Sequence, residues 1–288
     1  MEGAGLGKIH NLLDMTAYDV QEWLKKTDVI LVPIGSCERH GLHLPLGTDS
    51  YHAWSVTVEA AKKADVPHTP LVWCSYSPHH MREPNQGTGT ITLRGQTLRD
   101  LLSDITKSLI YHGFNKIIFV NFHGSNIKVI DEFLRTIRYQ TGALVAFYQH
   151  HFERQYKLIQ DLVKGPPEET PGWHAGEIET SMILAYDAKL VHMDRAVKDK
   201  AHAPKWLTEK FSKTDGSSTV VFEDSETTVL PMEHYEYSDT SVIGNPFRAT
   251  KEEGEKIIER MSTHLAHLID EVKKIKVTAK TREFSNRA

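Results

Sequence analysis

Val29-Ile30-Leu31-Val32-Pro33-Ile34 is an unbroken apolar stretch, which is typical of a strand that is covered on both faces. A pattern of helical spacing follows from Ser50 to Ala64, after the pair Thr48-Asp49, which is suited to cap a helix. The alternation continues, with strands predicted at 70–76, 116–122 and 143–148 and helices at 98–112, 127–139, 175–186 and 251–275. Strands that alternate with helices in this way predict an α/β protein with a mainly parallel sheet between layers of helices.

The length of 288 residues and the average composition fit one large α/β domain. No repeat with a period of about 20 to 50 residues and no low-complexity tract divides the chain. Residues 199–240 have weak periodicity and many polar side chains, and we expect them to be an excursion from this domain. Residues 276–288 are predicted to be a frayed polar tail. The sequence therefore predicts a single domain over residues 1–288.

Composition and charge argue against several classes of partner. Lys and Arg number 34 and Asp and Glu 38, a net charge of −4 without a basic cluster, so nucleic acid is not an expected partner. The longest apolar runs are far shorter than the roughly twenty residues that a membrane helix needs, so no membrane span is expected. With only Cys37 and Cys74 and no signal-peptide pattern at residues 1–5, we expect a cytoplasmic protein without disulfides.

The segment directly after the first predicted strand contains residue types that bind metals. Glu38 and His40 are two positions apart, so an extended backbone points both side chains the same way. Asp49 lies at the start of the next helix, and the glycines before it permit a loop that returns its carboxylate toward them. The alternative is a polar surface loop in which Asp49 serves only as a helix cap.

Two further polar clusters follow other predicted elements. His123 comes directly after the strand at 116–122, so in a parallel sheet it emerges at the same carboxyl edge as the first cluster. The third cluster lies at a helix start, where Glu177 and Glu179 are two positions, or about 200°, apart. At most one of these two glutamates is therefore expected to face the site, and the other to be a solvated or capping carboxylate.

These clusters match the motifs of a known family. Residues 38–49 fit the run E-x-H-G-x-H-L-P-x-x-T-D, residues 123–126 fit H-G-x-N, and residues 174–180 fit H-A-G-x-x-E-T. Residues 244–250 are similar to G-D-P-x-x-A-T, with Asn245 in place of Asp. On these motifs the chain resembles the creatininase (creatinine amidohydrolase) family over most of its length.

The resemblance implies a three-layer α/β/α sandwich, two divalent metal ions, and hydrolysis of a small polar cyclic carbon–nitrogen compound. It also implies a ring-shaped homo-oligomer, by family a hexamer. Carried over to this sequence, Glu38 and His123 would hold one metal, His40 would hold the second, and Asp49 would bridge both.

The resemblance also implies roles for the other polar residues of the clusters. Creatininase itself has a glutamate ligand where this chain has Ser125, so that role would pass to Glu179, to Glu177 or to water. We take Glu179 as the candidate ligand, and His174 and Glu177 as the candidates for catalysis. His174 would be a mobile proton donor or a substrate anchor.

Carboxylate and imidazole ligands without thiolate suit zinc, manganese or iron in the divalent state. Two such cations lower the pKa of a shared water toward neutrality and polarise a substrate carbonyl. Cleavage then needs a proton for the leaving atom, and His174 is the candidate acid.

The polar loop after the second predicted strand is expected near the same edge of the sheet. Ser77 and His80 match the S-x-x-H positions that contact substrate in the family, and Arg82 suits hydroxyl or carboxylate groups better than an apolar ring. Ser125 and Trp173 are the other candidates for substrate binding. The alternatives are a wet surface loop, an oligomer contact or, for Trp173, simple packing.

Three functions are compatible with these residues. The first is a metal-dependent amidohydrolase that opens a small cyclic amide or removes a formyl-type group. The second is hydrolytic carbon–carbon ring opening of a cyclic keto-polyol such as 3-dehydro-scyllo-inosose, in inositol catabolism, which is also found among creatininase-like proteins and which the polar loop favours. The third is a non-catalytic metal-binding assembly protein, which would bind metal without hydrolysing a substrate.

Overall fold

The central sheet of the computed structural model is parallel, as the sequence predicts. It consists of β1 (Val29–Ile34), β2 (Lys116–Asn121) and β3 (Leu144–Gln149) in the order β1-β2-β3. Val29 pairs with Lys116, and Lys116 in turn pairs with Leu144, so the three strands begin level and end at one edge. The structure describes residues 9–81, 86–149, 157–166, 174–213 and 215–280.

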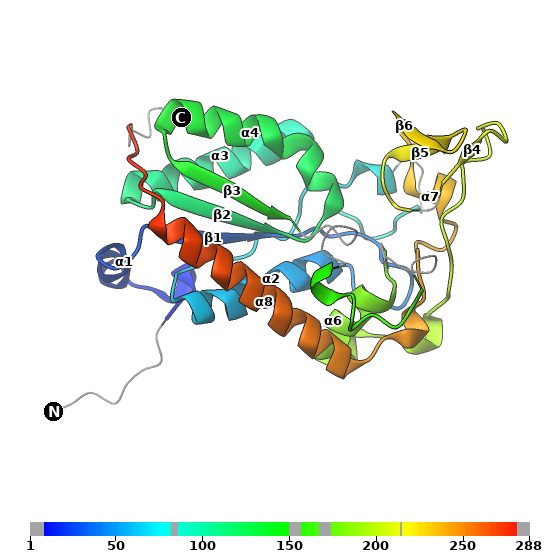
Figure 1. Ribbon diagram of the computed structural model, residues 1–288, viewed down its shortest axis with the longest axis horizontal. Coiled ribbons are helices and arrows are strands. Elements are labelled where there is room, and N and C mark those ends of the chain that lie inside the picture. Colours follow the sequence, from blue (N-terminus) through cyan, green and yellow to red (C-terminus); the bar gives the residue numbers. More distant parts are fainter. Residues whose placement is uncertain (1–8, 82–85, 150–156, 167–173, 214, 281–288) are drawn as a thin grey trace.

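Helices cover both faces of this sheet and make the three layers (Figure 1). One face packs against α3 (Gly95–His112) and α4 (Ile127–Thr141). The other packs against α2 (Thr48–Ala64), α6 (Glu177–Asp187) and α8 (Lys251–Lys274). A short helix, α1 (Ala17–Leu24), precedes the first strand. The predicted α/β/α sandwich is therefore confirmed.

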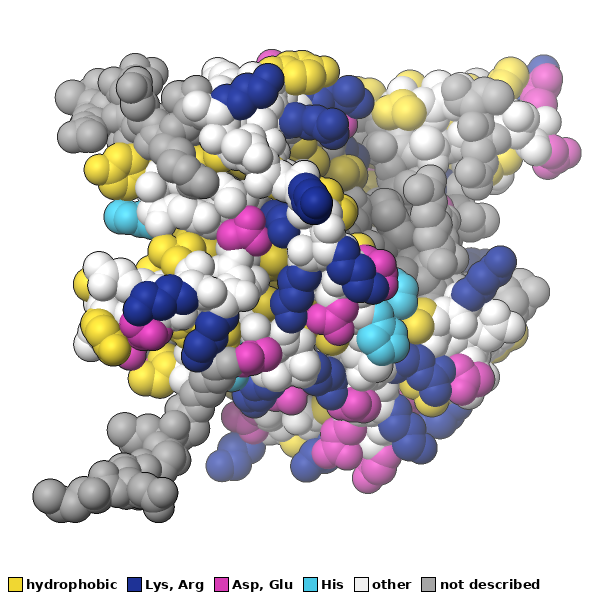
Figure 2. Space-filling model, turned by 60° about the vertical axis from the view of Figure 1, so that its left-hand side comes forward, with side chains coloured by type: hydrophobic (Ala, Val, Ile, Leu, Met, Phe, Trp, Pro, Cys, Tyr) yellow, Lys and Arg dark blue, Asp and Glu magenta, His cyan; other side chains and the backbone are white. Residues whose placement is uncertain are grey.

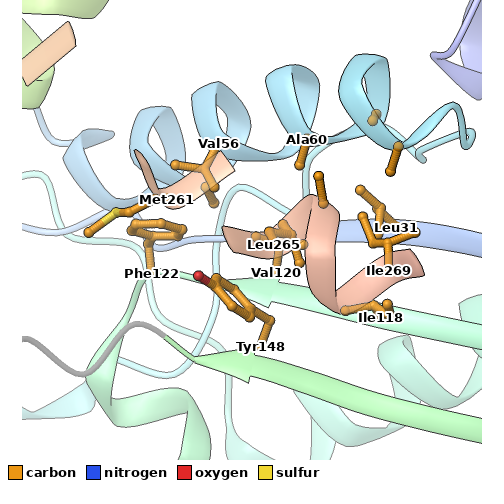
Figure 3. Packing of buried hydrophobic residues seen from close by; sticks show 14 of the residues in the cluster. Leu31, Val56, Ala60, Ile118, Val120, Phe122, Tyr148, Met261, Leu265 and Ile269 are labelled. Carbon is orange, nitrogen blue, oxygen red and sulfur yellow. The ribbon is translucent and has the colours of Figure 1, made fainter. Parts of the chain in front are cut away.

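Alternate residues of each strand point to opposite faces, and both sets are buried in β1 and β2. Figure 3 shows Leu31, Ile118 and Val120 packed against side chains of α2 and α8, such as Ala60 and Leu265. The intervening strand residues face α3 and α4 and belong to a second apolar cluster. Each fully buried aliphatic side chain contributes about 1.5 to 3 kcal/mol, so the two clusters hold the strands, and thus their carboxyl ends, in fixed positions.

The prediction of a regular strand at 70–76 is wrong. This segment runs beside β1 through isolated parallel bridges, His68 to Leu31 and Val72 to Ile34. The spacing changes by one residue between these bridges, and each of the two stretches contains a proline, Pro33 in β1 and Pro70 in the neighbouring segment. Proline has no amide hydrogen to donate, so a continuous ladder cannot form there.

The excursion at 199–240 contains a small antiparallel sheet and a short helix. The sheet consists of β4 (Phe211–Ser212), β5 (Thr219–Phe222) and β6 (Ser225–Val229), and α7 (His234–Tyr237) follows it. In Figure 1 these elements lie beyond the carboxyl ends of the central strands. They have their own apolar cluster, which includes Val220, Met232 and Tyr237, so this excursion is an ordered cover over one edge of the sheet.

Other boundaries differ by a few residues. The helix predicted from Ser50 begins at Thr48 with Gly47 as N-cap, so Thr48-Asp49 is not the cap and Asp49 lies within the first turn. Residues 276–280 of the predicted frayed tail are docked in part, since the Lys280 amide donates to the Thr141 carbonyl at 2.7 Å. The remainder of that predicted tail lies outside the described residues.

The described surface is mixed in charge on the face that Figure 2 draws, where basic and acidic side chains are interspersed. Among the helices of the described ranges, none has the length and apolar character needed to span a membrane.

Candidate metal centre

Six predicted site residues meet at the carboxyl edge of the sheet. Glu38 and His40 follow β1, Asp49 lies in the first turn of α2, and His123 follows β2. His174 and Glu179 arrive from the segment that enters α6. All six are at most 8% exposed, so residues from four separate stretches of chain form one buried polar cluster.

Asp49 lies between two groups of possible metal ligands. Its Oδ1 is 3.2 Å from His40 Nε2, which is itself 3.6 Å from Glu179 Oε2. Its Oδ2 is 3.0 Å from His123 Nδ1, which is 3.4 Å from Glu38 Oε2. Within each group the candidate ligand atoms lie within 4.8 Å of one another. One carboxylate thus offers one oxygen to each of two sites.

Backbone carbonyls fix which ring nitrogen of each histidine bears hydrogen. His40 Nδ1 lies 3.2 Å from the Glu38 carbonyl, His123 Nε2 3.0 Å from the Tyr76 carbonyl, and His174 Nδ1 2.9 Å from the Ser241 carbonyl. A carbonyl oxygen can only accept, so these nitrogens donate. The other nitrogen of each ring then directs a lone pair at carboxylate oxygens. Such an arrangement is repulsive without a cation or a proton between the groups, and it fits divalent metal binding.

The ionisation of these groups reflects the same arrangement. Burial alone would lower the pKa of His40, but the carboxylates of Asp49 and Glu179 outweigh it and raise this pKa to about 10. Burial would also lower the pKa of His123, but the carboxylates of Glu38 and Asp49 outweigh it and raise this pKa to about 9. Burial raises the pKa of Glu179 to about 8. In the metal-free protein, protons therefore hold these carboxylates together.

We predict that the metal-free protein becomes less stable as the pH rises above 6.5. The pKa values of His40 and His123 are higher in the folded protein than the value of 6.5 for histidine in the unfolded chain. The stability that this difference contributes is complete below pH 6.5 and is lost as the pH rises to about 9 to 10. Glu179 adds to the same trend from 4.5 to about 8. The melting temperature of chelator-treated protein should fall across this window, whereas that of metal-loaded protein should change little. Parallel curves for the two forms would contradict this account.

The structure does not bring Glu177 into the cluster. Its carboxylate accepts hydrogen bonds from the Lys164 amide at 2.7 Å and the Gly165 amide at 3.1 Å. Glu179 instead accepts from the Ala175 amide and reaches His40. Glu177 therefore holds the preceding loop against α6, and we do not retain it as a catalytic candidate.

Replacing Glu177 with Ala should destabilise the protein without removing metal. Two backbone amides would lose their acceptor, which costs about 1 to 3 kcal/mol of unfolding free energy for a buried donor. Denaturant unfolding combined with metal analysis tests this, with the exposed Glu255→Ala variant as control. Loss of one metal ion per chain in the Glu177 variant would show that this residue is a ligand after all.

The predicted substrate-binding residues fall in different places. Ser77 is buried and lies 2.7 Å from Ser36 Oγ and 3.1 Å from His123 Nε2, so it positions that histidine. His80 is also buried, with Nε2 3.7 Å from Glu38 Oε1. Ser125 lines the cavity described next. Arg82 and Trp173 lie outside the described residues, so their roles stay predictions.

The cluster forms one wall of a cavity of about 350 Å³. Its other walls include His79, from the polar loop expected near this edge. They also include residues that the sequence reasoning missed: Lys128, Ser217, Ser218, His234 and Tyr237. Four of these come from the excursion at 199–240. They belong to no motif, and only their polar or aromatic type distinguishes them in the sequence.

Lys213 holds the excursion in place over the cavity. Its buried ammonium group donates to the Ser217 carbonyl at 2.6 Å and to the Thr219 carbonyl at 3.1 Å. It also lies 4.7 Å from the centre of the Tyr237 ring, which permits a cation–π contact. One buried cation therefore orders both the loop and the helix that cover the site.

Fold and site together define a class: an α/β protein with a buried group of carboxylates and imidazoles, suited to metal binding, at the carboxyl edge of a parallel sheet. The family model for creatininase, described as creatinine amidohydrolase, matches residues 13–269. The chain belongs to the creatininase family of hydrolases.

Two relatives indicate the range of chemistry within this family. A 3-dehydro-scyllo-inosose hydrolase from Thermotoga maritima is 29% identical over 187 residues, which cover 64% of this chain and 58% of that protein. The match thus spans less than two thirds of that relative. A creatinine amidohydrolase from Pseudomonas putida is 31% identical over 180 residues, which cover 59% of this chain and 68% of the relative.

Solved structures of similar proteins have the same fold as this chain over nearly its whole length. A putative creatinine amidohydrolase from Bacteroides fragilis has a TM-score of 0.71 at 25% identity and covers 94% of this chain and 99% of that one. Two creatininase structures, a manganese form and a mutant of Zn–Zn type, each have a TM-score of 0.70 at 25% identity, covering 93% of this chain and 100% of theirs.

Proposed function

We propose that this protein is a metal-dependent hydrolase that opens a small polar cyclic amide at a binuclear centre. The observation behind it is the position of Asp49, whose two oxygens face two separate groups of ligand atoms. His40 and Glu179 would complete one metal site, and Glu38 and His123 the other. Zinc, manganese or iron in the divalent state suits this ligand set.

Two cations held there would supply an activated water and polarise the scissile carbonyl. The chain's own residues supply the rest. His174 lines the cavity, and its Nε2 lies 3.4 Å from Glu38 Oε1, beside the proposed metal site. Its other nitrogen is tied to the Ser241 carbonyl and its backbone pairs with Ile243. The ring is thereby oriented so that Nε2, which bears the lone pair, can accept the proton released when water attacks the carbonyl and pass it to the leaving nitrogen.

A second candidate is hydrolytic carbon–carbon ring opening of a cyclic keto-polyol. Ser125, Ser217 and Ser218 line the same cavity, and serine side chains suit the hydroxyl groups of a polyol ring. The Thermotoga relative acts on such a compound, by its name. This reaction would use the same activated water and the same proton donor.

A substrate panel on protein with its native metals tests both candidates. Metal analysis should give about two divalent ions per chain. Ring opening of five- or six-membered lactams, without turnover of 3-dehydro-scyllo-inosose, would support the amidohydrolase, and the reverse pattern the second candidate. Bound metal without turnover of either class would contradict both and favour the non-catalytic assembly protein.

A further inference from the structure

Lys128 provides a positive charge in the wall of the cavity. It lies in the first turn of α4 and lines the cavity together with Ser217 and Ser218 from the covering excursion. The same three residues also line an adjoining hollow of about 400 Å³. The ammonium group is therefore available to whatever occupies the space between the carboxylate cluster and the excursion.

The position of Lys128 is electrostatically unfavourable in the free protein. The first turn of a helix bears a partial positive charge, where a cation is disfavoured and an anion is stabilised. No acidic residue in the first turn of α4 offsets this partial positive charge. Within the described ranges, no carboxylate forms an ion pair with Lys128. When a charged side chain lies where the local electrostatics disfavour it, a bound ligand is often the reason.

His234 provides a second and independent sign of a ligand in this cavity. It lies on α7, lines the cavity and is only 5% exposed. Its Nε2 is buried, and in the described part of the chain it has no hydrogen-bond partner. A buried polar nitrogen without a partner is rare and costs stability unless a ligand or a water completes it. His234 and Lys128 thus offer two polar groups to one bound molecule.

We infer that Lys128 and His234, with the hydroxyls of Ser217 and Ser218, form a subsite for a carboxylate group of the substrate. This inference rests on the proposed function and narrows it to ring compounds that bear a negative charge away from the bond that is cleaved. A single lysine among neutral donors matches a carboxylate, which has one negative charge, better than a phosphate, which has up to two. An uncharged keto-polyol would leave the charge on Lys128 unmatched.

Binding of two probes that differ only in charge tests the subsite. Cyclopentanecarboxylate and cyclopentanecarboxamide are similar in size, and calorimetry on the metal-loaded protein gives an affinity for each. We expect the carboxylate to bind about tenfold more tightly, as for one charge-assisted contact. The preference should disappear in Lys128→Met and persist in Lys256→Met, which removes an exposed lysine of α8. Lys128→Glu should favour the carboxamide.

Two results would overturn the subsite. Equal affinities in the unmodified protein would show that no charge is recognised. A preference that persists in Lys128→Met would show that the carboxylate binds elsewhere, such as at the cations. Neither probe contains a ring amide, so the comparison does not depend on turnover. A protein that prefers the carboxylate through Lys128 but hydrolyses no lactam would refute the proposed function and leave the subsite standing.

Discussion

Asp49→Asn should yield a folded protein that no longer holds two metal ions and has lost nearly all activity. Both Asp49 oxygens take part in the proposed centre, one beside His40 and the other beside His123. The amide of Asn has one oxygen and no charge, so it cannot bridge two cations. Each cation in a binuclear site contributes several kcal/mol to the transition state, so we expect the rate to fall by at least about a thousandfold.

The comparison needs metal analysis and steady-state kinetics on the same samples. Asp100→Asn, which changes an exposed aspartate of α3, controls for the loss of one negative charge. Circular dichroism spectra of both variants establish that the fold is intact. An Asp49→Asn protein that keeps two ions per chain and turns over normally would refute the bridging role.

His174→Ala should separate metal binding from catalysis. His174 contacts Glu38 but belongs to neither of the two groups that share Asp49. Its removal should therefore leave the metal content at about two ions per chain. General acid catalysis contributes roughly 10²- to 10⁴-fold, and we expect the rate to fall by about that factor.

Two further measurements distinguish a proton donor from a packing residue. Added imidazole should restore part of the activity of His174→Ala, because the truncation leaves space beside the cavity for the small base. The exposed His267→Ala variant on α8 should behave like the unmodified protein. Unchanged activity in His174→Ala would exclude the proposed role, and loss of one metal ion would instead make His174 a ligand.

The layered fold and the convergence of the cluster follow from local patterns. Apolar runs such as Val29–Ile34 alternate with helices, and in a parallel sheet the residues after each strand meet at one edge. The predicted grouping of Glu38 and His40 with His123 follows from that rule, and that of Asp49 from the loop that returns it toward them. The structure brings these four residues together.

The choice between Glu177 and Glu179 could not be made from spacing alone. It depends on how the chain enters α6, where Ala175 has a φ of 56°, in the left-handed region that few non-glycine residues adopt. The amide of Ala175 donates to Glu179, while Glu177 turns toward the amides of another loop. No sequence pattern signals that backbone conformation at an alanine.

The outer wall of the cavity could not be predicted for a different reason. His234 and Ser217 come from the excursion, whose short strands show little periodicity. Their positions depend on long-range packing and on the contacts of buried Lys213. The regular elements of the fold are thus encoded locally, whereas the residues of the outer cavity wall are placed by tertiary contacts. The predicted homo-oligomer and the roles of Arg82 and Trp173 stay predictions.

A crystal structure of the manganese-loaded protein, with anomalous scattering recorded at the metal edge, tests the central claim most directly. The account predicts two anomalous peaks, one beside each oxygen of Asp49, with His40 and Glu179 at one and Glu38 and His123 at the other. A single peak, or two peaks that do not share Asp49, would contradict it.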